Sequence, residues 1–255
     1  MQPYLELDGT RVIAHGCGAG PWDPSMLHGG VPAALVARVV EDLPTAVPMR
    51  VTRLTVDLQR PVPVGELALD VAVTREGRNI QTSEVILSAN GKVVVRGAAL
   101  KIREAAGLQP EGTGLPTVRG LPPEKAPNDL VSVGFNETVE WRDAYPEDKG
   151  RAQRAVWCNI QRPFLEDHET TPLMRAAVTG DYCNGFGSQL DFNQWTYINA
   201  DLTLHFARAP VGDWMMLAAD CLIGPEGRAI AYGDLADVAG VFGRATQSQV
   251  IARRA

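Results

Sequence analysis

Apolar side chains recur with helical spacing in one long stretch of the first half of the chain, from about Leu27 to Leu43. Charged residues such as Arg38 fall on the other faces of this stretch, as in an amphipathic helix. Proline is tolerated only in the first turn of a helix, so Pro32 predicts a helix start close to residues 28–30. Three apolar positions four residues apart define the buried stripe: Val31, Leu35 and Val39.

Segments in which apolar and polar residues alternate follow this helix and predict strands. The first two lie around residues 53–59 and 67–73. Two longer ones, Asn79–Ser88 and Lys92–Ile102, are separated by Ala89-Asn90-Gly91. Because Asn-Gly favours a tight turn between antiparallel strands, this pair is predicted to form a hairpin.

The second half of the chain repeats this order of elements. A helical segment is predicted near Pro172–Tyr182. Strand-like segments precede and follow it: Val133–Trp141, Arg151–Ile160, Trp195–Ala207, Trp214–Ile223, Ile230–Asp237 and Val241–Ala252. One long helix with a run of antiparallel strands is therefore expected twice.

A segment rich in proline and glycine separates the two halves. Residues 104–129 hold five prolines and four glycines and few large apolar side chains, which is typical of a linker. The predicted organisation is one unit over residues 1–105, a linker over 106–129 and a second unit over 130–255.

Short matches between the halves support an internal repeat. Leu54-Thr55 parallels Leu202-Thr203, Pro63-Val64-Gly65 parallels Pro210-Val211-Gly212, and His28 with Pro32 parallels His168 with Pro172. A helix wrapped by a curved antiparallel sheet, present twice, predicts an α+β fold of two tandem hotdog units, a double hotdog. Pairing two such units covers a sheet edge that either one alone would expose.

Composition and charge narrow the function classes. The chain has 255 residues and a net charge of −6, and its acidic pI of about 5.3 argues against general nucleic-acid binding. Apolar runs do not approach the roughly 18 residues of a membrane span. The N-terminal MQPYLELDGT has neither a basic region nor an apolar one, so no signal peptide is expected. These features predict a cytoplasmic protein without a membrane partner.

Metal and cofactor motifs are missing from the sequence. The four cysteines form no CxxC pair, the four histidines no HExxH, and neither a Walker A nor a GxSxG motif occurs. The glycine-rich Gly16–Gly20 lacks the strand–helix context of a dinucleotide site, so a loop is expected there. We therefore predict no metal and no cofactor, apart from coenzyme A carried by a substrate.

Three segments resemble the double-hotdog acyl-CoA thioesterases of the thioesterase II (TesB-like) family. Residues 199–214 (NADLTLHFARAPVGDW) resemble the second half of these enzymes. Gly243-Arg244-Ala245-Thr246-Gln247, leading into residues 250–254, resembles their closing strand. Leu27-His28-Gly29-Gly30 resembles the entry to the first helix in hotdog thioesterases. The resemblance implies hydrolysis of acyl-CoA thioesters.

The resemblance also implies a set of catalytic residues. In TesB-like enzymes an Asp, a hydroxyl residue and a Gln orient the attacking water. By motif the Asp falls on Asp201 and the Gln on Gln247, whereas Cys221 and Leu222 stand where the hydroxyl is expected. A thiol donates and accepts only weakly, which leaves Thr203 or Ser248 as substitutes.

Hydrolysis of a thioester needs an aimed water, a carboxylate that takes its proton and donors for the developing oxyanion. A helix N-terminus supplies such donors, so His28, Gly29 and Gly30 are predicted to bind the substrate, together with Thr203. Three polar residues near the end of the second helix have two interpretations: they line the substrate groove or they cap the helix. They are Asp181, Tyr182 and Asn184.

Two other functions fit the same sequence. A hotdog enoyl-CoA hydratase would use Asp23 and His28, which stand five residues apart. A non-catalytic acyl-CoA-binding double hotdog would explain the missing hydroxyl residue. A homodimer or higher homo-oligomer is the default expectation, and the acyl-chain length stays open.

Overall fold

The alternating segments of the first half form an antiparallel sheet around one helix in the computed structural model, which describes residues 1–118, 134–144 and 154–254. The helix α1 spans Gly30–Asp42. The strands are β1 Leu5–Asp8, β2 Arg11–Ala14, β3 Met49–Leu58, β4 Gly65–Glu76, β5 Ile80–Ala89 and β6 Lys92–Arg103, with a short 3-10 helix η1 at Gly16–Gly18. Strands β1 and β2 were not predicted.

The predicted helix start and the predicted hairpin are both confirmed. Helix α1 begins at Gly30 and holds Pro32 in its first turn, where a missing N–H costs no helical hydrogen bond. Between β5 and β6, Asn90 and Gly91 have φ values of 50° and 72°. Positive φ at both turn positions suits the twist of the flanking strands, which is why Asn-Gly closes this hairpin.

The second half holds two helices and seven strands among the described residues. Helix α2 spans Pro172–Asp181, close to the prediction, and a short helix α3 at Cys183–Gly187 was not predicted. The strands are β7 Val139–Asp143, β8 Arg154–Ile160, β9 Trp195–Asn199, β10 Asp201–Phe206, β11 Met215–Ile223, β12 Arg228–Asp237 and β13 Gly240–Arg253.

Two strand predictions in this half need correction. The segment Val133–Trp141 was predicted as one strand, but Gly134–Thr138 is the 3-10 helix η2, and residue 133 lies outside the described residues. The segment Trp195–Ala207 is two strands, β9 and β10, which break at Ala200. Both strands pair with β13, so the break is a local bend in one path of the chain.

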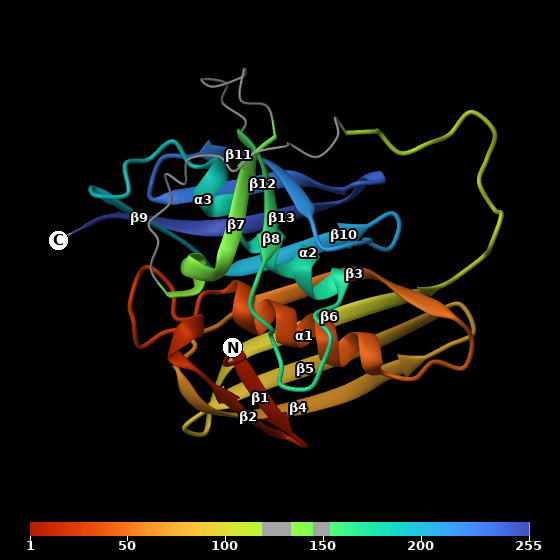
Figure 1. Ribbon diagram of the computed structural model, residues 1–255, viewed down its shortest axis with the longest axis horizontal. Helices are drawn as coiled ribbons and strands as arrows, with labels where there is room; N and C mark the ends of the chain where they lie inside the picture. The colour runs from red at the N-terminus through yellow and green to blue at the C-terminus, as the bar shows by residue number, and fades with distance from the viewer. Residues whose placement is uncertain (119–133, 145–153, 255) are drawn as a thin grey trace.

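All thirteen described strands belong to one antiparallel sheet, in which the two halves meet at β3 and β10. Thr55 on β3 pairs directly with Thr203 on β10, and these two residues are the counterparts that the repeat in the sequence suggested. Figure 1 shows the strands of the first half wrapped around α1 and those of the second half around α2 and α3. The two helices lie against each other between the halves.

Helix packing fixes which residues of the two halves correspond. A side chain at Gly97 would meet Val36 of α1 within 2.6 Å, and a side chain at Gly180 of α2 would lie 3.3 Å from Ala245. Gly97 and Ala245 hold the same place relative to the paired threonines on β3 and β10. Val36 therefore corresponds to Gly180, one helical turn away from the match of His28 with His168 that the sequence suggested.

The predicted linker at 106–129 falls between β6, which ends at Arg103, and η2, which begins at Gly134. Its residues 119–129 lie outside the described residues. In the described part, the carbonyl of Pro116 accepts a 2.9 Å hydrogen bond from the N–H of Val241 at the start of β13. This part of the linker therefore lies against the second half.

Candidate functional site

A carboxylate is buried where the two helices meet. Asp181 is the last residue of α2, and only 3% of it is exposed. The helix begins at the cap Thr171, whose hydroxyl accepts the N–H of Met174, and its apolar side chains face the sheet. The end of α2 is thereby packed against the start of α1, and Asp181 is almost completely buried.

Two side-chain amides and one imidazole surround this carboxylate. Oδ1 of Asp181 accepts from Nδ2 of Asn199 at 2.9 Å and from Nε2 of Gln247 at 3.3 Å. Nε2 of Gln247 also donates to the backbone carbonyl of Asp181 at 2.9 Å. Oδ2 lies 3.2 Å from Nδ1 of His28. Residues from both halves of the chain therefore meet at one carboxyl group.

Burial dominates the protonation of this group. Desolvation raises the pKa of Asp181 to about 7, although the hydrogen bonds from Asn199 and from the N–H of Gly30 favour the ionised form and lower it. Desolvation also lowers the pKa of His28 to about 4, so the imidazole is neutral near pH 7. A carboxyl group with a pKa near neutrality can both take up and release a proton at physiological pH.

The N-terminus of α1 forms the opposite wall of the site. The N–H of Gly30 is shared between the carboxylate of Asp181 and Nδ1 of His28, which lies 3.1 Å from the Gly30 nitrogen and accepts from it. A methyl group at Gly29 would lie 2.9 Å from both carboxylate oxygens of Asp181, and only glycine allows this approach. The positive end of the helix dipole faces the site, which favours negative charge developing there.

Aromatic side chains enclose the site on one side. The imidazole of His28 stacks on Phe135 with ring centres 4.9 Å apart, and the ring of Tyr182 lies 4.7 Å from it. The hydroxyl of Tyr182 donates to Oδ1 of Asn136 at 2.7 Å. Trp141 packs edge-on against Tyr182 at 4.6 Å. These rings exclude water behind the carboxylate and strengthen its electrostatic interactions.

Four of the seven site residues predicted from the sequence are brought together by the structure. Gln247, His28, Gly29 and Gly30 all contact Asp181 or lie next to it. They come from β13 and from the entry to α1, which are far apart in the sequence. The loop-and-helix entry predicted for substrate binding therefore lies at the buried carboxylate.

Asp201 and Thr203 lie on the opposite face of the sheet, so the structure does not bring them to Gln247. Their neighbour Leu202 points into the core, so Asp201 and Thr203 point outward. Oδ1 of Asp201 accepts the N–H of Ser248 at 2.7 Å, and the hydroxyl of Thr203 donates to that of Thr55 at 3.2 Å. One water cannot contact both Asp201 and Gln247.

The contacts of Asp181 described above include neither Cys221 nor Asp23. Cys221 lies on β11, in register with Ala231 of β12 and Gln247 of β13, and its thiol donates to Oε1 of Gln249 on β13 at 3.5 Å. The exposed carboxylate of Asp23 accepts from the N–H and the hydroxyl of Ser25 at 2.8 and 2.7 Å. The hydratase hypothesis paired Asp23 with His28, whereas the imidazole faces Asp181.

The sequence did not identify Asn199 as a site residue, and it did not decide between a groove-lining and a helix-capping role for Asp181. Asn199 stands two residues before the predicted Asp201, but on β9, from which its side chain turns inward. A signal for Asp181 existed, because it is an acidic residue at the end of an otherwise apolar helix face, where burial without a partner would be costly. Helix capping explains the same residue at that position in the sequence. The contacts of the Asp181 carboxylate with Asn199 and Gln247 exclude capping.

Two arginines of the second half are paired with carboxylates. Arg208 binds the fully buried carboxylate of Asp237 through both terminal nitrogens, at 2.7 and 2.6 Å. Arg244 donates to Asp234 at 2.7 Å. These pairs give both guanidinium groups a structural role in the second half.

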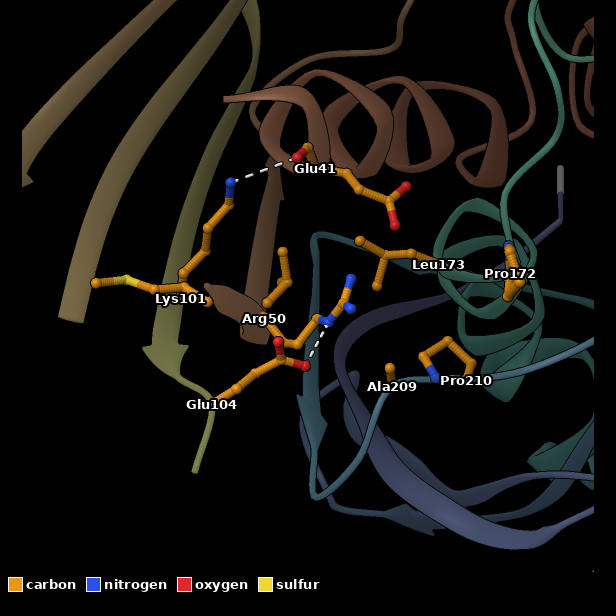
Figure 2. A pocket seen from close by; sticks show the side chains of 10 residues that line it. Glu41, Arg50, Lys101, Glu104, Pro172, Leu173, Ala209 and Pro210 are labelled. Carbon is orange, nitrogen blue, oxygen red and sulfur yellow. Dashed lines mark hydrogen bonds and ion pairs between the residues drawn. The ribbon is translucent and has the colours of Figure 1, made fainter. Parts of the chain in front are cut away.

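A cavity of about 380 Å³ lies at the counterpart position in the other half (Figure 2). It opens between the end of α1 and the start of α2, whereas the site at Asp181 lies between the end of α2 and the start of α1. Its walls include both charged and apolar side chains: Glu41, Arg50, Lys101, Glu104, Leu173 and Pro210.

The groups found around Asp181 have no counterpart in this second cavity. From the paired strands and helices, Ala37 corresponds to Asp181, Val51 to Asn199 and Ala99 to Gln247.

Three of the charged side chains at the second cavity, Lys101, Arg50 and Glu104, are bound to one another or to backbone. Lys101 donates to the carbonyl of Leu43 at 2.6 Å, and Arg50 donates to Glu104 at 2.7 Å. Among the residues that the structure describes, the arrangement around Asp181 is therefore not repeated in the counterpart cavity.

Two further observations concern metals and membranes. Within the described ranges, no three His, Cys, Asp or Glu side chains lie close enough together to hold a metal ion. No helix in the described part of the chain combines the length and the apolar character needed to cross a bilayer.

Family models match both halves of the chain. The model of the acyl-CoA thioesterase N-terminal domain matches residues 19–102, and that of the C-terminal domain matches residues 117–251. The chain belongs to the acyl-CoA thioesterase family. The TesB-like resemblance of the sequence is thereby confirmed, and the family implies an acyl-CoA substrate. No curated protein matches the sequence.

Solved structures share the fold at low sequence identity. The acyl-CoA thioesterase II TesB2 of Mycobacterium marinum is 18% identical, with a TM-score of 0.68 over 98% of this chain and 95% of that one. A candidate thioesterase II from Thermobifida fusca is 16% identical, with a TM-score of 0.74 over 98% and 95% of the two chains. A protein of unknown function from Alicyclobacillus acidocaldarius, described as a hot dog fold, is 16% identical, with a TM-score of 0.70 over 98% and 96%.

Proposed function

We propose that this member of the acyl-CoA thioesterase family hydrolyses acyl-CoA thioesters at the site around Asp181, without a covalent intermediate. The observation that carries the proposal is the buried carboxylate of Asp181, with a pKa near 7, held against the N-terminus of α1 by Asn199, Gln247 and His28. Asp181 takes the role that the sequence suggested for Asp201.

In the proposed reaction, Asp181 is the general base. A water held at the carboxylate attacks the thioester carbonyl carbon and gives its proton to Asp181. The proton on Oδ2 has an acceptor in Nδ1 of His28, 3.2 Å away, so the protonated form is also hydrogen-bonded. Gln247 and Asn199 keep the carboxylate in one orientation and contribute through positioning.

The start of α1 is proposed to stabilise the oxyanion. Negative charge that develops on the carbonyl oxygen is favoured by the positive end of the helix at Gly29 and Gly30. When the tetrahedral intermediate collapses, the carbon–sulfur bond breaks and the thiolate of coenzyme A leaves. The proton held by Asp181 passes to that thiolate, so the products are a carboxylic acid and free coenzyme A.

We also propose that the two halves are tandem hotdog units that form a double hotdog. Each half has one main helix wrapped by its own antiparallel strands, and the paired Thr55 and Thr203 relate the halves by an approximate two-fold axis. In this arrangement, Gly29 and Gly30 come from the first half, and Asp181, Asn199 and Gln247 come from the second. Neither half alone would then be active.

A thiol-release assay with acyl-CoAs from acetyl to palmitoyl tests the proposal. The expected kcat/KM falls tenfold per pH unit below about pH 7 and is constant above it, because only the ionised Asp181 accepts a proton. Replacement of Asp181 by Asn should abolish release, with a loss of about 10²–10⁴-fold.

A non-catalytic binding protein, or a base other than Asp181, would give a different result in this assay. Absence of release from every acyl-CoA, combined with thermal stabilisation by one of them, would contradict hydrolysis and favour a non-catalytic binding protein. Release that persists in Asp181→Asn would place the base elsewhere.

A further inference from the structure

Asn184, the second residue of α3, contacts both amide side chains that surround Asp181. Its backbone N–H donates to Oε1 of Gln247 at 3.0 Å. Its side-chain Nδ2 donates to Oδ1 of Asn199 at 3.4 Å and to the backbone carbonyl of Tyr197 at 3.4 Å. One residue thereby connects the two groups that bind the carboxylate.

These contacts determine which end of each amide faces Asp181. A primary amide presents an oxygen that accepts on one side and an NH2 group that donates on the other, and either orientation fits the same space. The backbone N–H of Asn184 can only donate, so Gln247 must turn its oxygen toward Asn184. Its NH2 group is then left for Asp181, at 3.3 Å from Oδ1.

The same logic applies to Asn199 through the side chain of Asn184. The carbonyl of Tyr197 can only accept, so it fixes the NH2 group of Asn184 on the side where Asn199 lies. Asn199 therefore accepts this hydrogen bond with its side-chain oxygen. Its own NH2 group then donates to Oδ1 of Asp181 at 2.9 Å. Other backbone carbonyls favour the same directions, since Gln247 also donates to the carbonyl of Asp181 at 2.9 Å and Asn199 to that of Asp201 at 3.4 Å. The N–H of Asn184 and the carbonyl of Tyr197 add to this orientation from the side away from the carboxylate.

We propose that Asn184 is a positioning residue that orients the amides of Asn199 and Gln247 so that both donate to Asp181. The opposite orientation of Asn199 would turn its oxygen toward the carboxylate, which would lose a donor and face a second negative dipole. Both effects disfavour the ionised form of Asp181. Asn184 touches neither the carboxylate nor a reacting atom in this network, so it acts only through its two partners.

This inference rests on the proposed role of Asp181 as the base, but part of its test does not need activity. The decisive variant is Asn184→Leu, which keeps the backbone N–H for Gln247 and removes the side-chain donor. Its matched control is Asn159→Leu, since Asn159 is a half-buried strand residue with one 3.3 Å hydrogen bond to Arg175, away from the site.

The expected result is an upward shift of the acid limb of kcat/KM by about 0.5–1 pH unit in Asn184→Leu, with the limb of Asn159→Leu unchanged. Well below this limb, such a shift lowers kcat/KM about 3–10-fold, and KM should change little. In an Asn199→Ala background the same substitution should add no further shift, because its partner is already gone.

Folding stability measured against pH provides the readout that does not depend on hydrolysis. The pKa of Asp181 also determines how far its contribution to the free energy of unfolding falls between pH 4 and 8. Asn184→Leu should make this fall larger. Loss of activity with an unchanged acid limb and an unchanged stability profile would overturn the inference. So would additive shifts in the Asn199→Ala background.

The outcomes separate this inference from the proposed function. If wild type releases no thiol but Asn184→Leu still enlarges the fall in the free energy of unfolding between pH 4 and 8, the positioning role holds and the proposed hydrolysis is refuted. If Asn184→Leu does not fold, Asn184→Ser tests the same point, since its shorter side chain does not span to Tyr197 and Asn199. An unchanged profile in the serine variant would likewise contradict the role of Asn184.

Discussion

The buried carboxylate of Asp181 lowers stability near neutral pH, and Asp181→Asn should reverse that loss. An aspartate has an ordinary pKa of 3.8, whereas burial raises that of Asp181 to about 7 in the folded chain. Between these values the folded state keeps a proton that the unfolded chain has lost. The contribution of Asp181 to stability therefore falls as pH rises from 4 to 7 and stays low above 7. His28, with its lowered pKa, contributes in the opposite direction between pH 4 and 6.5, and this contribution is common to wild type and Asp181→Asn.

The size of this effect follows from the difference in pKa. About 3 pH units at about 1.4 kcal/mol each give a loss of about 4 kcal/mol at pH 8 relative to pH 4. Asparagine is permanently neutral and fits the same contacts, since Oδ1 can accept from Asn199 and Gln247 while Nδ2 donates to His28. The variant should match wild type at pH 4 and exceed it by about 4 kcal/mol at pH 8, with no thiol release.

Urea unfolding at pH 4, 6 and 8 measures this difference. With a typical m-value of about 2–3 kcal/mol/M, the midpoint of Asp181→Asn should lie about 1.5 M above that of wild type at pH 8. The control is Asp201→Asn on the outer face of the sheet, which should keep the pH profile and the activity of wild type. Parallel profiles for wild type and Asp181→Asn would refute the raised pKa and the base assigned from it.

Two further substitutions test the geometry around the site and the second half. Gly29→Ala should lower kcat about 10–100-fold without unfolding the chain, because a methyl 2.9 Å from both oxygens of Asp181 displaces the carboxylate by a few tenths of an ångström. Gly16→Ala, with open space at its Cβ, is the control, and equal kinetics for the two variants would contradict the close contact. Arg208→Ala should lower the free energy of unfolding by about 3–5 kcal/mol, measured with urea, because it leaves the buried carboxylate of Asp237 unpaired. A loss below 1 kcal/mol would mean that the pair is not desolvated.

Local pattern was enough to predict most elements of the fold. Periodicity and proline placement located α1, and Asn90-Gly91 located the hairpin between β5 and β6, because backbone sterics act within a few residues. Strands β1 and β2 have only four residues each and escaped prediction. Their pairing depends on partners elsewhere in the chain.

The choice between two aspartates shows where local reasoning failed. Asp201 belongs to the most family-like segment of the sequence, yet side chains alternate along β10 and its carboxylate turns away from Gln247. Asp181 looked like a helix-end residue until α2 was packed against α1. Which face a side chain occupies depends on register, and a shift by one residue reverses it.

The sequence by itself determined the start of α1 near His28–Gly30 and the resemblance to the acyl-CoA thioesterase family, because each is carried by contiguous residues. The division into two tandem units stays a prediction. Only the tertiary structure decided that Asp181, Asn199 and Gln247 share one buried site and that the counterpart cavity lacks these groups. These side chains come from one helix and two strands, and their distances depend on strand register and helix packing. The protonation of Asp181 follows from the same packing, since burial raises its pKa to about 7.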